Sequence, residues 1–239
     1  MLYSSINNQK IKDINMLKQK KYRDKENLFL VEGKHLVKEA YDNGYLKELL
    51  TPQNSSYKLD VETNEISENV IKYLTELENP TGIFGICEKK QMTFKEGKVL
   101  ILDSVQDPGN IGTIIRSSVA FNIDTIIINE KCADIYSSKV IRASQGMIFN
   151  ANIIKEELTE TIKKIKSTHK VYATKVDGGK NIKDIEKIKK FAIIMGNEGN
   201  GVSEELVSLA HENIYIPMNE KCESLNVAVA TSIILYELS

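Results

Sequence analysis

The stretch IIMGNEGNGVSEEL, residues 193–206, decides the fold of this chain. An apolar run leads into three closely spaced glycines, and a helical pattern follows, which is the strand–turn–helix order of an α/β protein. A dinucleotide loop has the order G-x-G-x-x-G, follows the first strand, and has an acidic residue about twenty positions later. Here the glycine order is G-x-x-G-x-G, the loop comes late, and Glu198 would repel a pyrophosphate. The dinucleotide interpretation therefore fails. A carboxylate at this turn suits a cationic ligand or partner, an ion pair with an arginine such as Arg116, or simple capping of the turn.

The sequence around this stretch alternates between strand and helix patterns. Near-continuous apolar runs, typical of strands covered on both faces of a parallel sheet, occupy 98–103, 125–129, 151–155, 170–174, 191–196 and 213–218. Helical patterns separate or follow them at 110–122, 137–147, 157–168, 203–211 and 225–238. This order predicts an α/β domain with ligand sites at the carboxyl ends of its strands.

A smaller α/β unit is expected upstream. Residues 27–44 indicate a strand followed by a helix that stops near Gly44, and short strands are expected at 46–51 and 83–89. The polar stretch 89–98 has little periodicity and indicates a linker. We therefore expect a basic arm and small domain over 1–92, a linker over 93–98 and the larger domain over 99–239.

Composition excludes several classes of protein. The 239 residues are 41% hydrophobic and 27% charged, as in ordinary soluble proteins. No apolar run is long enough to span a membrane, and the N-terminus has no signal-peptide pattern. The three cysteines are odd in number and far apart, which predicts a reducing cytoplasm, cysteines that serve packing, and neither a disulfide framework nor a metal site.

The first 25 residues carry an excess of positive charge. They contain seven Lys and Arg residues against Asp13 and Asp24. Such a patch can follow a phosphate backbone, and it can equally be the solvated face of a helix. We take four of these cations as candidate RNA contacts: Lys18, Lys20, Lys21 and Arg23.

Two more strand-to-helix junctions are rich in polar and small residues. In 102–122, Asn110 is expected to cap the following helix, and Arg116 lies on that otherwise apolar helix, where it can reach an anionic partner or extend to solvent. In 216–233, Ser224 is expected to cap the last helix, and Asn226 places an amide in its first turn. All three junctions are expected at one edge of the sheet.

Together these motifs resemble the SpoU/TrmH ribose methyltransferases of the SPOUT superfamily. The resemblance rests on DPGNIGTIIRSS (107–118), IIMGNEGNGVSEEL (193–206) and IPMNEKCESLNVAVATSIILYE (216–237), and it covers residues 99–239. It implies a parallel sheet with a deep trefoil knot and S-adenosylmethionine as the cofactor, whose sulfonium charge explains a carboxylate in the glycine loop. Residues 20–92 resemble the N-terminal substrate-binding domain of the 23S rRNA branch, which is similar to ribosomal proteins that bind kinked RNA.

The resemblance also implies roles for individual residues. The cofactor-binding residues would be Thr174, Gly196, Gly199, Ile216, Met218 and Leu225. The reaction site would consist of Asn110, Arg116, Glu198, Ser224 and Asn226. Arginine keeps its proton at neutral pH, so we expect Arg116 to stabilise the developing 2′-alkoxide, aimed by a bidentate pair with Glu198. Ser224 and Asn226 would position the ribose or stabilise the loop.

The expected activity is methylation of a ribose 2′-hydroxyl in RNA, with 23S rRNA as the expected substrate, by a cytoplasmic enzyme that needs no metal. By resemblance the protein is a homodimer built across the last helix, with both chains completing each active site. A tRNA ribose methyltransferase and a non-catalytic RNA-binding assembly protein remain alternatives. The candidates for stacking on RNA bases are Tyr22, Phe29, Tyr41 and Tyr45. Aromatic residues at such positions more often belong to the core.

Overall fold

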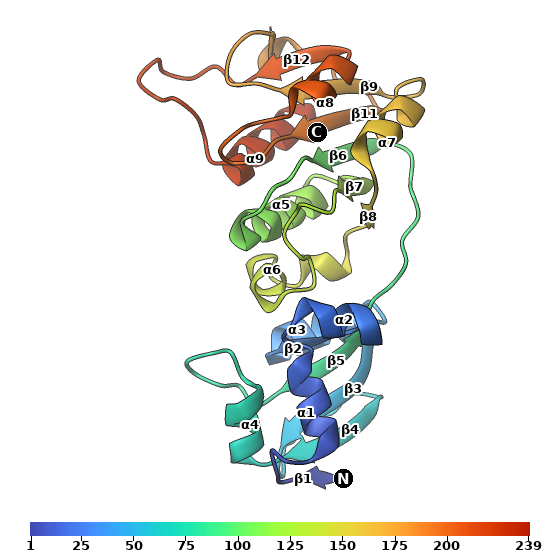
Figure 1. Ribbon diagram of the computed structural model, residues 1–239, viewed down its shortest axis with the longest axis vertical. Coiled ribbons are helices and arrows are strands. Elements are labelled where there is room, and N and C mark those ends of the chain that lie inside the picture. The colour runs from blue at the N-terminus through green and yellow to red at the C-terminus, as the bar shows by residue number, and fades with distance from the viewer. The chain divides into compact units, whose positions relative to one another are not determined.

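The computed structural model describes all residues, 1–239, and the chain forms two compact units (Figure 1). The first comprises Met1–Lys90 together with Asp134–Phe149, and the second comprises Gln91–Ala133 together with Asn150–Ser239. The chain therefore passes between the units three times. No helix in either unit has both the length and the hydropathy that a bilayer span requires.

The first unit is built on a five-stranded mixed sheet in the order β1-β4-β3-β5-β2. Its strands are β1 Leu2–Tyr3, β2 Leu28–Glu32, β3 Leu46–Pro52, β4 Glu62–Ile66 and β5 Phe84–Glu88. Its helices are α1 Gln9–Met16, α2 Lys20–Glu26, α3 Lys34–Asp42, α4 Glu68–Leu74, α6 Ser138–Ala143 and the 3₁₀ turn η1 Met147–Phe149. β5 pairs antiparallel with β2 and β3, whereas β4 pairs parallel with β3 and β1.

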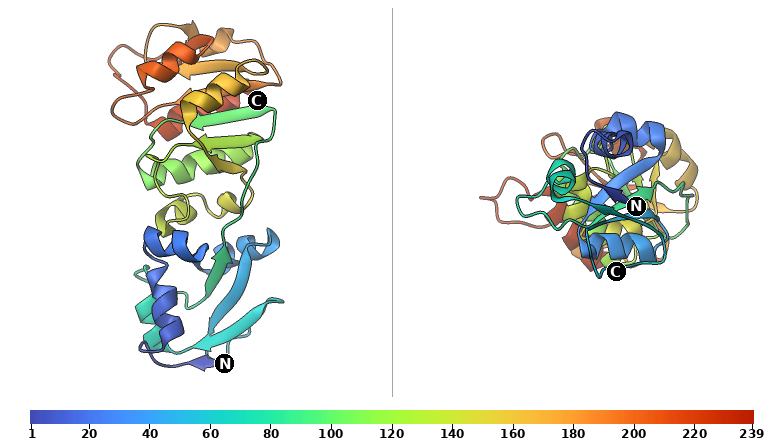
Figure 2. Two further views of the ribbon diagram at one scale, coloured as in Figure 1. Left: turned by 45° about the vertical axis from the view of Figure 1, so that its right-hand side comes forward. Right: turned by 90° about the horizontal axis from the view of Figure 1, so that it is seen from below.

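The basic N-terminal stretch begins with a capped helix. Asn8 caps α1 by accepting from the backbone N–H of Lys10 at 2.9 Å. The buried side chains Ile11 and Ile14 of α1 join a core with α4 and the sheet, and Figure 2 shows α1 beside α4. The N-terminal stretch therefore packs on the small domain through Ile11 and Ile14, while Lys12 of the same helix is exposed.

The second unit is built on a seven-stranded, all-parallel sheet in the order β10-β12-β9-β11-β6-β7-β8. Its strands are β6 Lys98–Leu102, β7 Thr125–Ile128, β8 Ile153–Lys155, β9 Lys170–Thr174, β10 Lys180–Asn181, β11 Phe191–Met195 and β12 Glu212–Tyr215. Its helices are α5 Pro108–Ala120, α7 Leu158–Ile165, α8 Glu204–Leu209, α9 Val227–Leu238 and the 3₁₀ turn η2 Ile182–Asp184.

Apolar side chains cover both faces of this sheet. Alternate strand residues, such as Val99 and Ile101 of β6, pack with α7 and α8 in one core. The intervening Leu100 and Leu102 are also fully buried and point to the opposite face. Helices α5 and α9 pack against each other (Figure 1). Burial on both faces is the physical reason for the continuous apolar runs of the sequence.

The predicted α/β class and parallel sheet are confirmed. All six strands expected in this unit exist within a few residues of their predicted bounds, and the two-residue β10 is an addition. The predicted helix over 137–147 is shorter, since α6 ends at Ala143 and Gln145 and Gly146 adopt positive φ. The domain bounds of 1–92 and 99–239 and the trefoil knot stay predictions.

Candidate active site

The glycine loop after β11 closes on itself. Asn197 and Gly201 exchange backbone hydrogen bonds of 3.0 and 2.9 Å, and the side chain of Asn197 accepts from the N–H groups of Gly199 and Asn200. Gly196 is buried, and a Cβ there would lie 2.0 Å from the carbonyl carbon of Gly201. The glycine at 196 is therefore required because the loop packs on its own backbone.

Glu198 lies at the mouth of this loop and is held by the first motif. Its carboxylate accepts hydrogen bonds from the backbone N–H groups of Gln106 (3.2 Å) and Asp107 (3.0 Å) and from the side-chain amide of Asn110 (3.0 Å). Partial burial raises the pKa of this carboxyl, but the bonds from Asn110 and Asp107 outweigh it, and the pKa lies below its usual value. The carboxylate therefore stays ionised and connects two of the three motifs.

Asn110 and Asn226 connect the third motif to the same network. Asn226 Nδ2 donates to Asn110 Oδ1 at 2.9 Å, and Asn226 Oδ1 accepts from the N–H groups of Ala228 and Val229. Asn226 is thus the N-cap of α9, and Asp107 is the N-cap of α5. The predicted caps, Asn110 and Ser224, are wrong by a few residues. The Asn110 side chain instead links Glu198 to Asn226.

A cavity of about 630 Å³ opens beside the glycine loop. Its wall includes every predicted cofactor residue and three predicted reaction residues: Thr174, Gly196, Gly199, Ile216, Met218, Leu225, Glu198, Ser224 and Asn226. The residues come from the ends of β9, β11 and β12 and from the start of α9, as expected for the carboxyl edge of a parallel sheet.

The other two predicted reaction residues do not line the cavity. Asn110 reaches it only through its hydrogen bonds to Asn226 and Glu198. Arg116 is exposed on α5 and has no hydrogen bond or ion pair within the chain. The expected pair between Arg116 and Glu198 is therefore absent. Arg116 lies six residues beyond Asn110, about 9 Å along the helix and on another face.

The structure separates the four predicted RNA contacts. Lys20 and Lys21 are exposed on α2. Lys18 is half-buried, its ammonium donates to the carbonyl of Tyr73 at 2.9 Å, and burial lowers its pKa. Arg23 is only 5% exposed and all its contacts are internal, so its assignment to RNA is wrong. Of the stacking candidates, Phe29 and Tyr45 belong to the core.

Sequence reasoning missed two kinds of site residue. Asn197 organises the loop and donates to the carbonyl of Ser104 at 2.9 Å; the preference of asparagine for hydrogen bonding its own turn was the available signal. Asp177 and Glu204 place further carboxylates on the cavity wall. Nothing in their local sequence sets them apart from other surface acids.

The cavity, the glycine loop and the linked motifs lie in a region that matches a known protein family. The model of the SpoU rRNA methylase family matches residues 97–236, and the model of the MRM3-like substrate-binding domain matches residues 8–85. This chain belongs to the SpoU rRNA methylase family. It is 39% identical to the 23S rRNA (guanosine(2553)-2′-O)-methyltransferase RlmP of Bacillus subtilis, over 98% of this chain and 97% of that protein.

Solved structures of family members are similar over the whole chain. The AdoMet-bound rRNA methyltransferase of Sinorhizobium meliloti has a TM-score of 0.88 and 33% identity, covering 100% of this chain and 97% of its own. A TrmH/SpoU tRNA-modifying enzyme of A. aeolicus has a TM-score of 0.52 and 26% identity, covering only 62% of this chain and 76% of its own.

Proposed function

We propose that this chain methylates a guanosine ribose of 23S rRNA at the edge of its parallel sheet where the three motifs meet. The enzyme class follows from the family: the chain is an RNA 2′-O-methyltransferase that uses S-adenosylmethionine. The finer assignment of substrate is supported by the 39% identity to RlmP over almost the full length of both chains. The guanosine corresponding to 2553 of that relative's substrate is therefore the first nucleotide to map. Such a substrate would place the enzyme in the cytoplasm.

The substrate-binding domain favours rRNA over tRNA. The matched tRNA-modifying enzyme covers only 62% of this chain, whereas the RlmP match extends through the N-terminal unit. A tRNA substrate is thus the weaker alternative. A purely structural role in ribosome assembly would not require the intact hydrogen-bonded network of Asn110, Glu198 and Asn226.

The cavity fits S-adenosylmethionine. Its volume of about 630 Å³ lies within the range typical of small-molecule sites. The carboxylates of Asp177, Glu198 and Glu204 on its wall suit a positively charged ligand. We assign the cofactor contacts to the six predicted residues at the ends of β9, β11 and β12 and at the start of α9. When bound, the cofactor supplies an electrophilic methyl group on a cationic sulfur.

The reaction-site residues then have distinct roles. Glu198 holds the first motif against the glycine loop through Asp107 and Asn110. Asn226 fixes Asn110 from the other side and begins α9, so the ribose-binding edge is organised before RNA arrives. Methyl transfer depends mainly on holding the 2′-oxygen in line with the methyl carbon. We assign that positioning to Ser224 and Asn226.

Arg116 supplies positive charge to the developing 2′-alkoxide. Its guanidinium keeps its proton at neutral pH, so it stabilises charge and does not remove the proton of the hydroxyl. Within one chain Arg116 is exposed and reaches no site residue. We therefore assign it to the active site of a second copy.

A homodimer through α9 would make this possible. Val229, Ile233 and Tyr236 of α9 are 48%, 38% and 69% exposed and lie at i, i+4 and i+7 on one helical face. Tyr236 contacts Phe121 at the end of α5, the helix that carries Arg116. This apolar face next to Arg116 suits a two-fold contact between copies of the chain.

The test of the reaction is transfer of tritiated methyl from S-adenosylmethionine to total RNA from a strain that lacks this protein. Labelled positions are mapped by their resistance to alkaline cleavage. We expect one labelled guanosine in 23S rRNA, and none with Asn226→Ala. Lys164→Ala, which removes an exposed cation on α7, is the matched control. No incorporation into any RNA by a protein that binds the cofactor would refute the proposal.

The test of the shared site is complementation between two inactive variants. Arg116→Ala and Asn226→Ala chains are mixed under conditions that exchange subunits. If Arg116 acts in the partner's site, half of the dimers are mixed and each has one complete site, which restores about 25% of wild-type activity. No recovery in verified mixed dimers would show that Arg116 acts within its own chain. Sedimentation of Ile233→Glu, with exposed Ile6→Glu as control, tests the interface itself.

A further inference from the structure

The segment Asp134–Phe149 belongs to two regions at once. By sequence it lies within the stretch 97–236 that matches the SpoU methylase family. In the structure it folds with Met1–Lys90, the unit that contains the substrate-binding match. The chain leaves the second unit after Ala133 and returns to it at Asn150, so this segment accounts for two of the three passages between the units.

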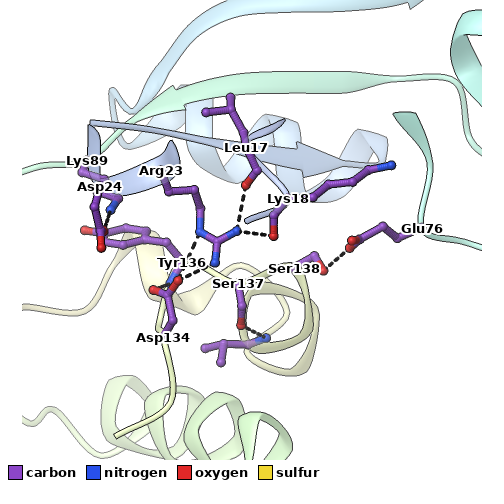
Figure 3. Close-up of polar contacts among 11 residues, drawn as sticks. Leu17, Lys18, Arg23, Asp24, Glu76, Lys89, Asp134, Tyr136, Ser137 and Ser138 are labelled. Carbon is purple, nitrogen blue, oxygen red and sulfur yellow. Dashed lines mark hydrogen bonds and ion pairs between the residues drawn. The ribbon is translucent and has the colours of Figure 1, made fainter. Parts of the chain in front are cut away.

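An internal ion pair fixes the start of this segment (Figure 3). Arg23 of α2 donates from Nε and Nη2 to Asp134 Oδ2 at 3.1 and 2.5 Å. Its Nη1 donates to the carbonyls of Leu17 and Lys18, which follow α1, at 2.7 Å each. The side chains of Arg23 and Asp134 are only 6% and 16% exposed. The guanidinium therefore binds the end of α1 and the start of the segment simultaneously.

Aromatic packing fixes the rest of the segment. Phe29 of β2 lies with its ring centroid 4.7 Å from that of Tyr136 and 6.2 Å from that of Phe149. Tyr45 contacts Phe149 at 5.2 Å, and the ammonium of Lys89 lies 5.2 Å above the Tyr136 ring. Both ends of the segment are thus packed on the same part of the first unit.

Polar contacts complete the attachment. Ser138 donates to Glu76 (Figure 3), and His35 of α3 lies 3.0 Å from the carbonyl of Gln145. Gly146 has φ +81°, and a Cβ there would lie 3.0 Å from Cγ of Glu39. The segment therefore contacts α2, β2, α3 and the residue Glu76 after α4.

We infer that Arg23, through Asp134, is a positioning residue for the methylation reaction, because it holds Asp134–Phe149 in the RNA-binding unit. This inference rests on the proposed function. RNA bound by the first unit must present one ribose to a cofactor bound in the second. If the segment detaches from the first unit, two of the three chain passages between the units become flexible linkers. The effective concentration of the RNA-bound ribose at the cofactor then falls. Cofactor binding, which involves only the second unit, should not change.

The experiment compares wild type with Asp134→Asn, which removes the charge but keeps an acceptor for the N–H of Tyr136. Glu68→Gln, which breaks the exposed Glu68–Lys72 pair of the same unit, is the matched control. Three quantities are measured on the full chain: KM and kcat for 23S rRNA, calorimetric affinity for S-adenosylmethionine, and amide hydrogen exchange of residues 134–149. Arg23→Lys tests whether a cation without the planar fork suffices.

We expect Asp134→Asn to raise the KM for RNA at least fivefold, with kcat and cofactor affinity within twofold of wild type and faster exchange over 134–149. Glu68→Gln should change none of these. Unchanged exchange in Asp134→Asn would overturn the attachment role whatever the activity. Faster exchange with an unchanged KM, or an equal loss of cofactor affinity, would overturn the positioning role. A wild type that binds cofactor but methylates no RNA would instead refute the proposed function.

Discussion

Replacing Gly196 by alanine tests the glycine loop most directly. A Cβ at this position would lie 2.0 Å from the carbonyl carbon of Gly201, 2.1 Å from the nitrogen of Val202 and 2.3 Å from the carbonyl oxygen of Gly201. All three atoms belong to the backbone, so no side chain can turn away. Relief to an ordinary contact of 3.4 Å requires the loop to move by about 1.4 Å, and packed interiors resist such shifts.

The size of the effect follows from that displacement. Overpacking of this kind costs about 1–3 kcal/mol. If cofactor binding requires the native shape of the loop, the same free energy is lost from binding, which corresponds to an affinity roughly 5- to 150-fold weaker. The expected readout is a higher Kd for S-adenosylmethionine by isothermal titration, with a modest fall in melting temperature.

Gly199→Ala is the matched control. It changes a glycine of the same loop, but a Cβ there would meet only Asn197 Oδ1, at 3.6 Å. We expect affinity within about twofold of wild type, since such a contact requires no movement. Wild-type affinity in both variants would refute the argument that steric closure of the loop shapes the cofactor site. Equal and large losses would show that both positions need glycine for direct approach of the ligand.

Three further outcomes are expected. The pKa of Glu198 is lowered in the folded chain from the usual carboxyl value of 4.5. The ionised carboxylate therefore contributes to the free energy of unfolding above pH 4.5, and this contribution is lost as the pH falls through the lowered pKa. The stability difference between wild type and Glu198→Gln, measured by thermal unfolding, should therefore be constant above pH 4.5 and shrink as the pH falls below it. Lys20→Ala with Lys21→Ala should reduce the salt dependence of RNA binding by about 0.7 per lysine in log–log slope, measured by filter binding; an unchanged slope would exclude these lysines as phosphate contacts. Of the cysteines, exposed Cys222 should react with a thiol reagent in the native protein and buried Cys87 only after unfolding, as followed by mass spectrometry of labelled peptides.

Local patterns predicted the parallel sheet well because its strands are buried on both faces. Runs such as 191–196 are apolar at every position for that reason, and they were found as β11 and its neighbours. The first unit was harder to predict. β4, with the sequence ETNEI, buries only Asn64 and Ile66, so its sequence has no continuous apolar run.

The sequence predicted which residues gather at the candidate site, but not the hydrogen bonds between them. The motif residues do meet at one edge of the sheet, since strand ends of a parallel sheet share an edge. Which side chain bonds to which depends on a few ångströms of backbone placement. Glu198 therefore accepts from Asp107 and Asn110, although a pairing with Arg116 was equally compatible with the sequence.

The sequence by itself thus determined the α/β class, the parallel sheet and the loops that carry the chemistry, because these depend on periodicity and residue type within short windows. Only the tertiary structure decided that Arg23 is internal and that it binds Asp134, which lies 111 positions away in the chain. The same holds for the folding of Asp134–Phe149 with the first unit. Whether a charged side chain is buried depends on the groups that surround it, and these are distant in the sequence. A local pattern of lysines and arginines therefore does not predict which of them is buried.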